Sequence, residues 1–243
     1  DISNSRRTKR KPIIVIVGRQ HPPEITGYLA MQAFMEKILD ASKEDKKFLQ
    51  KYRILFYPII NPDGVDLGNW RHNAGGVDLN RDWGSYHQPE IKQICDHIVS
   101  QAKRNKTEVI LGLDFHSTQK DILYTNLRAQ NREPLIPVQP HGRAARDEAR
   151  TESSPVGRHG RAALIEQVGI TKAWLNALNS TLAEDLIVEP SGTRPVATSK
   201  TWFTEELGAE GIIYEVGDQT ERSYIKEKAQ IAAALLMEIL VNL

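Results

Sequence analysis

The sequence predicts an α/β protein whose mostly parallel central sheet has helices on both faces. Short apolar, β-branched runs alternate along the chain with longer segments in which apolar residues recur at helical spacing. This alternation favours parallel pairing, because each helix returns the chain to the start of the next strand. The 243 residues suit one such domain, and 40% of them are apolar, which is enough for a sizeable core.

Four runs are predicted to be strands. The run 13–17 reads Ile-Ile-Val-Ile-Val and is followed by Gly18, which is typical of a strand buried on both faces. Three further runs share its character, and four segments between or after the strands have helical spacing. The other strands are expected at 53–60, 109–115 and 211–216, and the helices at 24–39, 89–104, 171–182 and 222–240.

One segment interrupts this pattern. Residues 137–161 are crowded with Arg, Gly, Pro and Ser, and the pentapeptide that begins at His141 recurs at His159. Such composition is typical of a flexible surface insertion rather than of a core element. We therefore expect a single catalytic domain over 1–243 with an insertion at 137–161.

Composition also argues against several classes of function. Lys and Arg total 32 and Asp and Glu total 31, so the formal charge is +1 and a general nucleic-acid or anionic-membrane binder is disfavoured. No run approaches the roughly 20 apolar residues that a membrane span needs. A single cysteine, Cys95, excludes an intrachain disulfide, and its side chain is expected to be a packed residue of the helix 89–104.

Two histidines and a glutamate lie where predicted strands end. His21 and Glu24 follow the first strand, and His116 follows the run 109–115. The carboxyl edge of an open α/β sheet is where ligands usually bind. Two His and one carboxylate, with a position left open for water, form the ligand set of catalytic rather than structural zinc. The remaining histidines lack such settings and are expected on the surface or in packing roles: His72, His87, His97, His141 and His159.

Two polar stretches follow the second strand. The stretch 61–64, Asn-Pro-Asp-Gly, has the chemistry of a turn, since Pro fixes one φ and Gly accepts a positive one. The stretch 68–83 carries two arginines, an asparagine and an aspartate among glycines. Arginine binds a carboxylate through two parallel hydrogen bonds, so this stretch could recognise the free C-terminus of a peptide.

These motifs occur in the order found in the zinc carboxypeptidase A-like (M14) family, which the chain resembles. The form Gly-Asn-Trp-Arg followed by Gly-x-Asp-Leu-Asn-Arg is closer to the cytosolic carboxypeptidase and bacterial branches than to the pancreatic enzymes. The resemblance implies a mixed, mostly parallel sheet of the phosphorylase/hydrolase-like fold. The matching segments are His21-x-x-Glu24, Asn61-Pro-Asp-Gly64, Trp70-Arg71, Gly76-Val-Asp-Leu-Asn-Arg81, Asp114-Phe-His-Ser117 and Tyr214-Glu215.

The resemblance also implies a role for each matching residue. It makes His21, Glu24 and His116 the ligands of one Zn²⁺ per chain. A buried carboxylate near the metal suits a general base, and fixed cations suit the oxyanion and the substrate's terminal carboxylate. The implied roles are general base and acid for Glu215, oxyanion stabilisation for Arg71, binding of the terminal carboxylate for Asn80 and Arg81, and orientation of His21 for Asp78.

The sequence departs from the family at two places. Digestive members carry a mobile loop tyrosine before the catalytic glutamate, whereas between Ser191 and Glu215 the one tyrosine is Tyr214, next to the base.

Lys200 falls near the position that selects the terminal side chain, where it would favour an acidic residue, although it could also be a solvated loop charge. In addition, the family usually has more strands before the first zinc-binding loop, so N-terminal strands or a preceding β domain are expected to be missing.

The expected function is that of a zinc-dependent metallocarboxypeptidase. Its substrate would be a peptide with a free C-terminal carboxylate, whose last peptide or isopeptide bond is hydrolysed by a metal-activated water. Two alternatives stay open at this point. One is a zinc-dependent deacylase of N-acyl amino acids that resembles desuccinylases and aspartoacylases, and the other is a non-catalytic module that binds peptide termini.

Overall fold

A computed structural model describes residues 1–3, 10–44, 46–125, 169–182, 187–190 and 197–243 of the chain. The predicted insertion 137–161 lies outside these residues, and so do His141 and His159. The strands are β1 (Ile13–Gly18), β2 (Arg53–Tyr57), β3 (Val109–Thr118), β4 (Ile122–Thr125), β5 (Ile187–Pro190) and β6 (Glu210–Gly217).

Within this part of the chain, six strands form one mixed sheet in the order β2-β1-β3-β6-β4-β5. The pairs among β2, β1, β3 and β6 are parallel, whereas β4 runs antiparallel to β6 and parallel to β5. This confirms the predicted α/β fold with a mostly parallel, mixed sheet.

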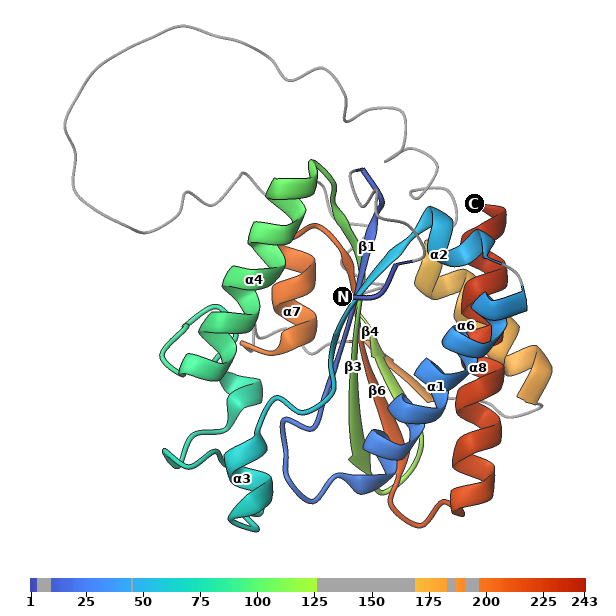
Figure 1. Cartoon of the computed structure of the whole chain (residues 1–243). Coiled ribbons are helices and arrows are strands. Elements are labelled where there is room, and N and C mark those ends of the chain that lie inside the picture. Colours follow the sequence, from blue (N-terminus) through green and yellow to red (C-terminus); the bar gives the residue numbers. More distant parts are fainter. Residues whose placement is uncertain (4–9, 45, 126–168, 183–186, 191–196) are drawn as a thin grey trace, which may run out of the picture.

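Helices cover both faces of the sheet (Figure 1). They are α1 (Ile25–Glu44), α2 (Lys47–Lys51), α3 (Pro62–Asp66), α4 (Pro89–Asn105), α6 (Ile170–Leu182), α7 (Ser199–Glu205) and α8 (Arg222–Asn242), with a 3-10 helix at Leu79–Arg81. The apolar contacts form two clusters, one that joins the sheet to α1, α6 and α8 and another that joins it to α4 and α7.

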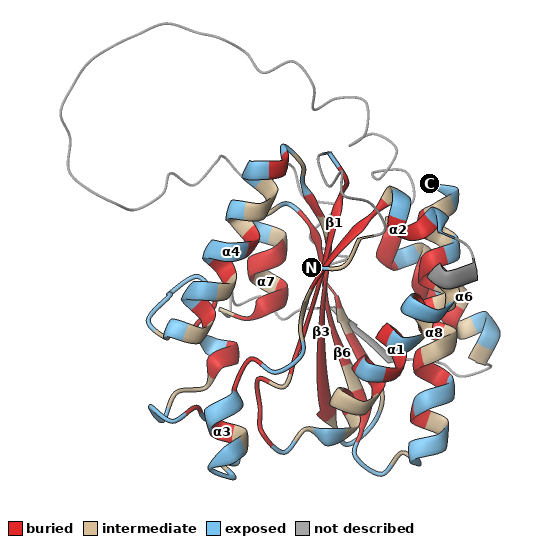
Figure 2. Ribbon diagram, in the orientation of Figure 1, coloured by how far each residue is buried: buried red, intermediate tan, exposed pale blue. Residues whose placement is uncertain are grey.

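Strand β1 shows why its sequence predicts a sheet covered on both faces. All six of its residues are buried, and Figure 2 shows that most of the sheet is buried in the same way. Successive side chains of a strand point to opposite faces. Ile14 and Ile16 accordingly pack in the α1, α6 and α8 cluster, whereas Ile13, Val15 and Val17 pack in the α4 and α7 cluster.

Several element bounds differ from those predicted. Strand β2 ends at Tyr57 rather than at residue 60, because Pro58 has no N–H for the strand ladder. Strand β3 continues to Thr118, so His116 lies inside the strand and not after it. Strands β4 and β5 were not predicted, since each has four residues and too little periodicity to be recognised.

The stretch 61–64 is the start of a helix, so its prediction as a simple turn was wrong. Asn61 is the N-cap of α3, where its Oδ1 accepts the N–H of Gly64 at 3.0 Å, and Pro62 takes the first helical position. The amide Nδ2 of buried Asn61 also donates to the carbonyl oxygens of Gln20 and His72 at 3.0 and 3.2 Å. Asn61 therefore ties the loop after β1 to the polar stretch that follows α3.

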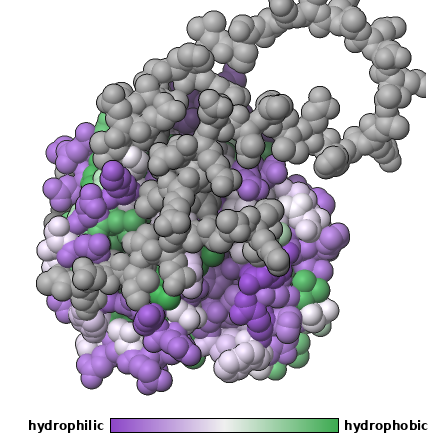
Figure 3. Space-filling view, turned by 180° about the vertical axis from the view of Figure 1, so that it is seen from behind, coloured by the Kyte–Doolittle hydropathy of each residue, from purple (hydrophilic) through white to green (hydrophobic). Residues whose placement is uncertain are grey.

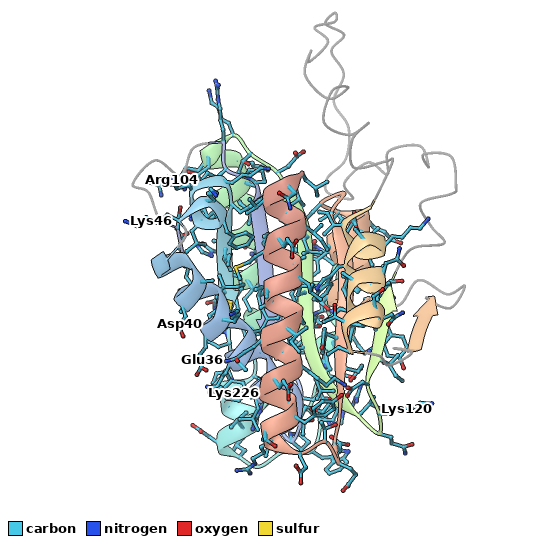
Figure 4. The ribbon with its side chains drawn as sticks, turned by 90° about the vertical axis from the view of Figure 1, so that its right-hand side faces the viewer. Glu36, Asp40, Lys46, Arg104, Lys120 and Lys226 are labelled. Atoms are coloured by element: carbon cyan, nitrogen blue, oxygen red, sulfur yellow. The ribbon has the colours of Figure 1, made fainter. Side chains whose placement is uncertain are left out.

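The outer surface is mainly polar. Where described residues are visible from behind, hydrophilic side chains predominate and apolar ones form small separate areas (Figure 3). The side view shows charged side chains along the outside of α1 and α8, among them Glu36 and Lys226, which form an exposed ion pair at 3.9 Å (Figure 4). None of the helices in the described ranges has the length and apolar character needed to cross a bilayer.

Candidate functional site

The loop after β1 places His21 and Glu24 at the carboxyl edge of the sheet. Arg19 adopts φ 57°, a left-handed conformation that turns the chain sharply after Gly18. The loop is held from behind, because Ile60 and Asn61 donate their backbone N–H groups to the carbonyls of Gly18 and Arg19. His21 is buried, and Glu24 immediately precedes α1.

His116 reaches the same edge from the neighbouring strand. Strands β1 and β3 are parallel and pair Gly18 with Phe115, so the residues that follow them lie side by side. His116 is 1% exposed and stands beside His21, with the ring centroids 4.9 Å apart. The local order of each segment and the parallel register together bring the predicted ligands into contact.

The Glu24 carboxylate lies between the two imidazole rings. Its Oε1 is 2.7 Å from Nδ1 of His21 and its Oε2 is 2.7 Å from Nδ1 of His116. The ligand atoms of the three residues all lie within 4.8 Å of one another. Two imidazole nitrogens and one carboxylate that converge in this way fit a catalytic zinc ion, for which they leave a coordination position open.

The ring nitrogens turned away from this cluster also meet carboxylates. His21 Nε2 lies 2.9 Å from Oδ1 of Asp78, whose Oδ2 accepts a hydrogen bond from Nε of Arg71 at 2.8 Å. His116 Nε2 lies 2.9 Å from Oδ2 of Asp114. Histidines that bind metals characteristically donate their other ring N–H to such acceptors, so the outer contacts also fit a metal centre.

Electrostatics favour an ionised Glu24 in this cluster. Burial alone would raise the pKa of Glu24, but the charge and hydrogen bonds of His116 and His21 outweigh burial and hold it at about 2. Burial likewise acts to lower the pKa of His21, yet the hydrogen bonds to Asp78 and Glu24 raise it above its usual value. The site therefore holds an ionised carboxylate beside imidazoles that must lose a proton before they can bind a metal.

Glu215 stands next to this cluster on β6. The sheet pairs His116 with Glu215, so both occupy the same level of adjacent parallel strands. Its Oε2 is buried and has no hydrogen-bond partner among the described residues. Burial raises the pKa of Glu215 to about 7, and the negative charges of Glu24 and Asp114 add to this rise, whereas His116 opposes it. The carboxyl group can thus exchange a proton near neutral pH.

The two residues expected to bind a terminal carboxylate have different surroundings. Arg81 is exposed, and its Nη1 donates to the carbonyl oxygen of Asn80 at 2.8 Å. Asn80 is buried, its Oδ1 accepts the N–H of Ser199 at 3.1 Å, and its Nδ2 lies 3.3 Å from Nε2 of His116. The Asn80 side chain is therefore built into the support of the cluster, whereas the Arg81 guanidinium faces solvent.

Lys200 lies on a helix and not on a loop. It is the second residue of α7 and is 5% exposed, so the alternative of a solvated loop charge was wrong. Burial lowers the pKa of Lys200 to about 8. Its selection of an acidic side chain remains a prediction.

Sequence reasoning gave no role to Gln20 and Asp114, which lie near Nε2 of His116, or to Ser199, which contacts Asp114. Gln20 Nε2 donates to Asp114 Oδ2 at 2.5 Å, and Ser199 Oγ donates to the same oxygen. One signal for Asp114 was available, because it is a charged residue inside the apolar run 109–115. Gln20 and Ser199 carry no comparable signal. As expected, Cys95 is buried, and His72, His87 and His97 are exposed.

Comparison with known proteins identifies the family of the chain. The family model for zinc carboxypeptidases, peptidase family M14, matches residues 1–239. Over 109 residues, 44% of this chain, the sequence is 38% identical to cytosolic carboxypeptidase 2 of Xenopus tropicalis. Over 121 residues, 49% of this chain, it is 33% identical to cytosolic carboxypeptidase 3 of Bos taurus. These alignments cover 11% and 12% of the two relatives.

Solved structures show the same fold. A metallo-carboxypeptidase from Pseudomonas aeruginosa superposes with a TM-score of 0.66 at 19% identity, over 97% of this chain and 59% of that one. A metallo-carboxypeptidase from Burkholderia cenocepacia gives 0.65 at 17% identity, over 96% and 59%. The chain thus spans less than two thirds of the length of each of these proteins. Because the family model covers nearly its whole length, the chain belongs to the zinc carboxypeptidase family.

Proposed function

We propose that this chain is the catalytic domain of a zinc metallocarboxypeptidase that releases the last residue of a peptide with a free C-terminal carboxylate. The observation that carries this proposal is the convergence of His21, Glu24 and His116 at one sheet edge with Glu215 beside them. These three residues would hold one zinc ion. When bound, zinc lowers the pKa of a water ligand to about 7 and polarises the scissile carbonyl.

Glu215 is the proposed general base and acid. It would take a proton from the attacking water and pass it to the leaving amine of the substrate. Its buried Oε2 and its pKa of about 7 support this role, because a carboxyl group titrating near neutral pH can both accept and return a proton.

Arginines would handle the charges of the substrate. Arg71 is fixed through its Nε by Asp78 and keeps 40% of its side chain exposed, which suits stabilisation of the oxyanion by its terminal nitrogens. Arg81 is the proposed partner of the terminal carboxylate, and Asn80 would contribute next to it. The exposed guanidinium of Arg81 supports this assignment more directly than the enclosed amide of Asn80 does.

Lys200 would give the enzyme a preference for an acidic terminal residue. A buried cation favours a carboxylate over a basic side chain, because like charges repel strongly where little water screens them. Its 5% exposure supports a desolvated environment for such a pair.

The test combines a base variant with a panel of substrates. Glu215→Gln is expected to retain stoichiometric zinc by mass spectrometry and to lose about 100-fold or more in peptide hydrolysis. Glu227→Gln, an exposed substitution on α8, is the matched control and should retain full activity. Unchanged turnover in Glu215→Gln would rule out its role.

The panel compares peptides with acidic, basic and apolar last residues, their C-terminal amides, and N-acyl amino acids. Hydrolysis of free-acid peptides but not of the amides is expected. Preferential cleavage of N-acyl amino acids would instead favour the deacylase, and zinc binding without any turnover would favour the binding module. Equal rates for acidic and basic last residues would contradict the role of Lys200 alone.

A further inference from the structure

We propose that Asp114 is a positioning residue that holds His116 in the tautomer and orientation needed to bind the metal through Nδ1. This inference rests on the proposed zinc site and adds a residue to which the sequence motifs give no role. Asp114 is 0% exposed and lies two residues before His116 on β3, so both side chains point to the same face of the strand. Its Oδ2 is 2.9 Å from Nε2 of His116.

The surroundings of Nε2 allow one assignment of its proton. If Nδ1 offers its lone pair to a metal, Nε2 carries the hydrogen and needs an acceptor. Besides Asp114, two side-chain nitrogens lie near Nε2, namely Nδ2 of Asn80 at 3.3 Å and Nε2 of Gln20 at 3.4 Å. Amide nitrogens do not accept hydrogen bonds, so the Asp114 carboxylate is the acceptor.

The orientations of both amides are themselves fixed. Gln20 Oε1 accepts the indole N–H of Trp83 at 2.8 Å, and Asn80 Oδ1 accepts the backbone N–H of Ser199 at 3.1 Å. Rotating either amide by 180° would place its NH₂ group against another donor. Neither oxygen can therefore replace Asp114 as the acceptor for Nε2 of His116.

Asp114 is itself held by donors from two other segments. Gln20, in the loop after β1, and Ser199, the first residue of α7, both donate to Oδ2, the oxygen that faces His116. Its Oδ1 is buried without a hydrogen-bond partner in the described ranges. The hydrogen bonds thus concentrate on the oxygen that contacts the histidine, which fixes the direction of the carboxylate.

Zinc affinity measured by chelator competition tests this arrangement. Asp114→Asn keeps the shape of the side chain but can present an NH₂ group to Nε2, which would favour the tautomer with the proton on Nδ1. Loss of such an outer acceptor typically weakens metal binding about 10-fold to 100-fold, and this is the expected result. Asp82→Asn is the matched control, because Asp82 is equally buried but accepts the backbone N–H groups of His87 and Gln88.

A spectroscopic measurement on the unaltered protein makes the test independent of whether Asp114→Asn folds. In the zinc-loaded chain, ¹H–¹⁵N correlation spectra should show His116 with its proton on Nε2, shifted downfield by the carboxylate and protected from exchange. The assignment follows from loss of the signal in His116→Ala.

The outcomes separate this inference from the proposed function. Weakened zinc binding in Asp114→Asn, with Asp82→Asn unchanged, supports the positioning role. Equal zinc affinity in Asp114→Asn and the unaltered protein, or a His116 proton on Nδ1, would overturn it while leaving the zinc site intact. Failure of the unaltered protein to bind zinc would overturn the proposed function itself.

Discussion

At the scale of single residues, Glu215 links catalysis to the stability of the fold. Burial penalises the charged form of Glu215 and raises its pKa from the unperturbed 4.5 to about 7. The folded metal-free protein therefore keeps this proton until the pH approaches 7. Between these two values the folded state binds more protons than the unfolded state. The contribution of Glu215 to stability therefore falls as pH rises from about 4.5 to about 7 and stays low above that range.

Glu215→Gln is accordingly expected to stabilise the metal-free protein at pH 8. The gain should be on the order of 2 kcal/mol, since one pKa unit corresponds to about 1.4 kcal/mol and the side chain retains some solvent contact. At pH 4.5 the gain should largely vanish. Urea unfolding in the presence of a chelator at both pH values measures the difference, and a gain that is the same at both would contradict the burial of this carboxylate.

At the scale of elements, the first turn of α1 packs directly against β3 beside the candidate zinc ligands. The Gly27 N–H donates to Oγ of Ser117 at 2.9 Å, and a Cβ added at Gly27 would lie 2.2 Å from the carbonyl oxygen of His116. Glycine is required here because backbone approaches backbone directly. Glu24 and His116 thus meet through an approach that any larger residue would prevent.

Gly27→Ala should therefore weaken zinc binding as well as the fold. The added methyl must push α1 away from β3, which separates Glu24 from His116. Overpacking of this kind costs about 1–3 kcal/mol, which exceeds the gain of about 1 kcal/mol from replacing glycine in a helix. Thermal unfolding and chelator competition check both effects. Gly75→Ala is the control, because its methyl would lie 3.4 Å or more from the nearest atoms and should leave zinc affinity unchanged.

Helix α7 shows what element prediction from the sequence missed. Gly112 on β3 and Gly211 on β6 are register partners, and they leave room for the Phe203 ring and the Lys200 backbone, respectively. A Cβ at either glycine would lie within 2.4 Å of these atoms. Helix α7 can therefore pack against the sheet only because both positions are glycine. Its seven residues are too few to show a periodic pattern in the sequence. This docking also brings Ser199 to Asp114 and Asn80.

At the scale of the whole molecule, the zinc site would join two elements of the central sheet. His21 and Glu24 come from the connection between β1 and α1, and His116 comes from β3. A metal bound by the folded but not by the unfolded chain stabilises the fold by about 2.7 kcal/mol at a free concentration 100 times its Kd. For a protein of this size, that corresponds to roughly 5–10 °C in Tm.

Zinc removal is thus expected to lower Tm by roughly that amount. Scanning calorimetry with excess zinc and with a chelator measures the shift. His116→Ala should abolish the difference between the two conditions, whereas His97→Ala, which alters an exposed histidine on α4, should preserve it. A shift that survives His116→Ala would place the stabilising metal elsewhere.

The sequence by itself determined the sheet class and the members of the metal cluster. Strand β1 could be predicted because burial on both faces requires an uninterrupted apolar run. His21 and Glu24 could be predicted because they lie three residues apart, and His116 because an apolar run leads directly to it.

Only the tertiary structure decided which side chains hold His116 in place. The contacts of Ser199 with Asp114 and Asn80 span 85 and 119 residues, and that of Gln20 with Asp114 spans 94. It likewise decided that Lys200 is buried and that the Asn80 side chain turns inward. Periodicity and motif spacing record what neighbouring residues require of one another, whereas these partners meet only when distant strands and α7 pack together.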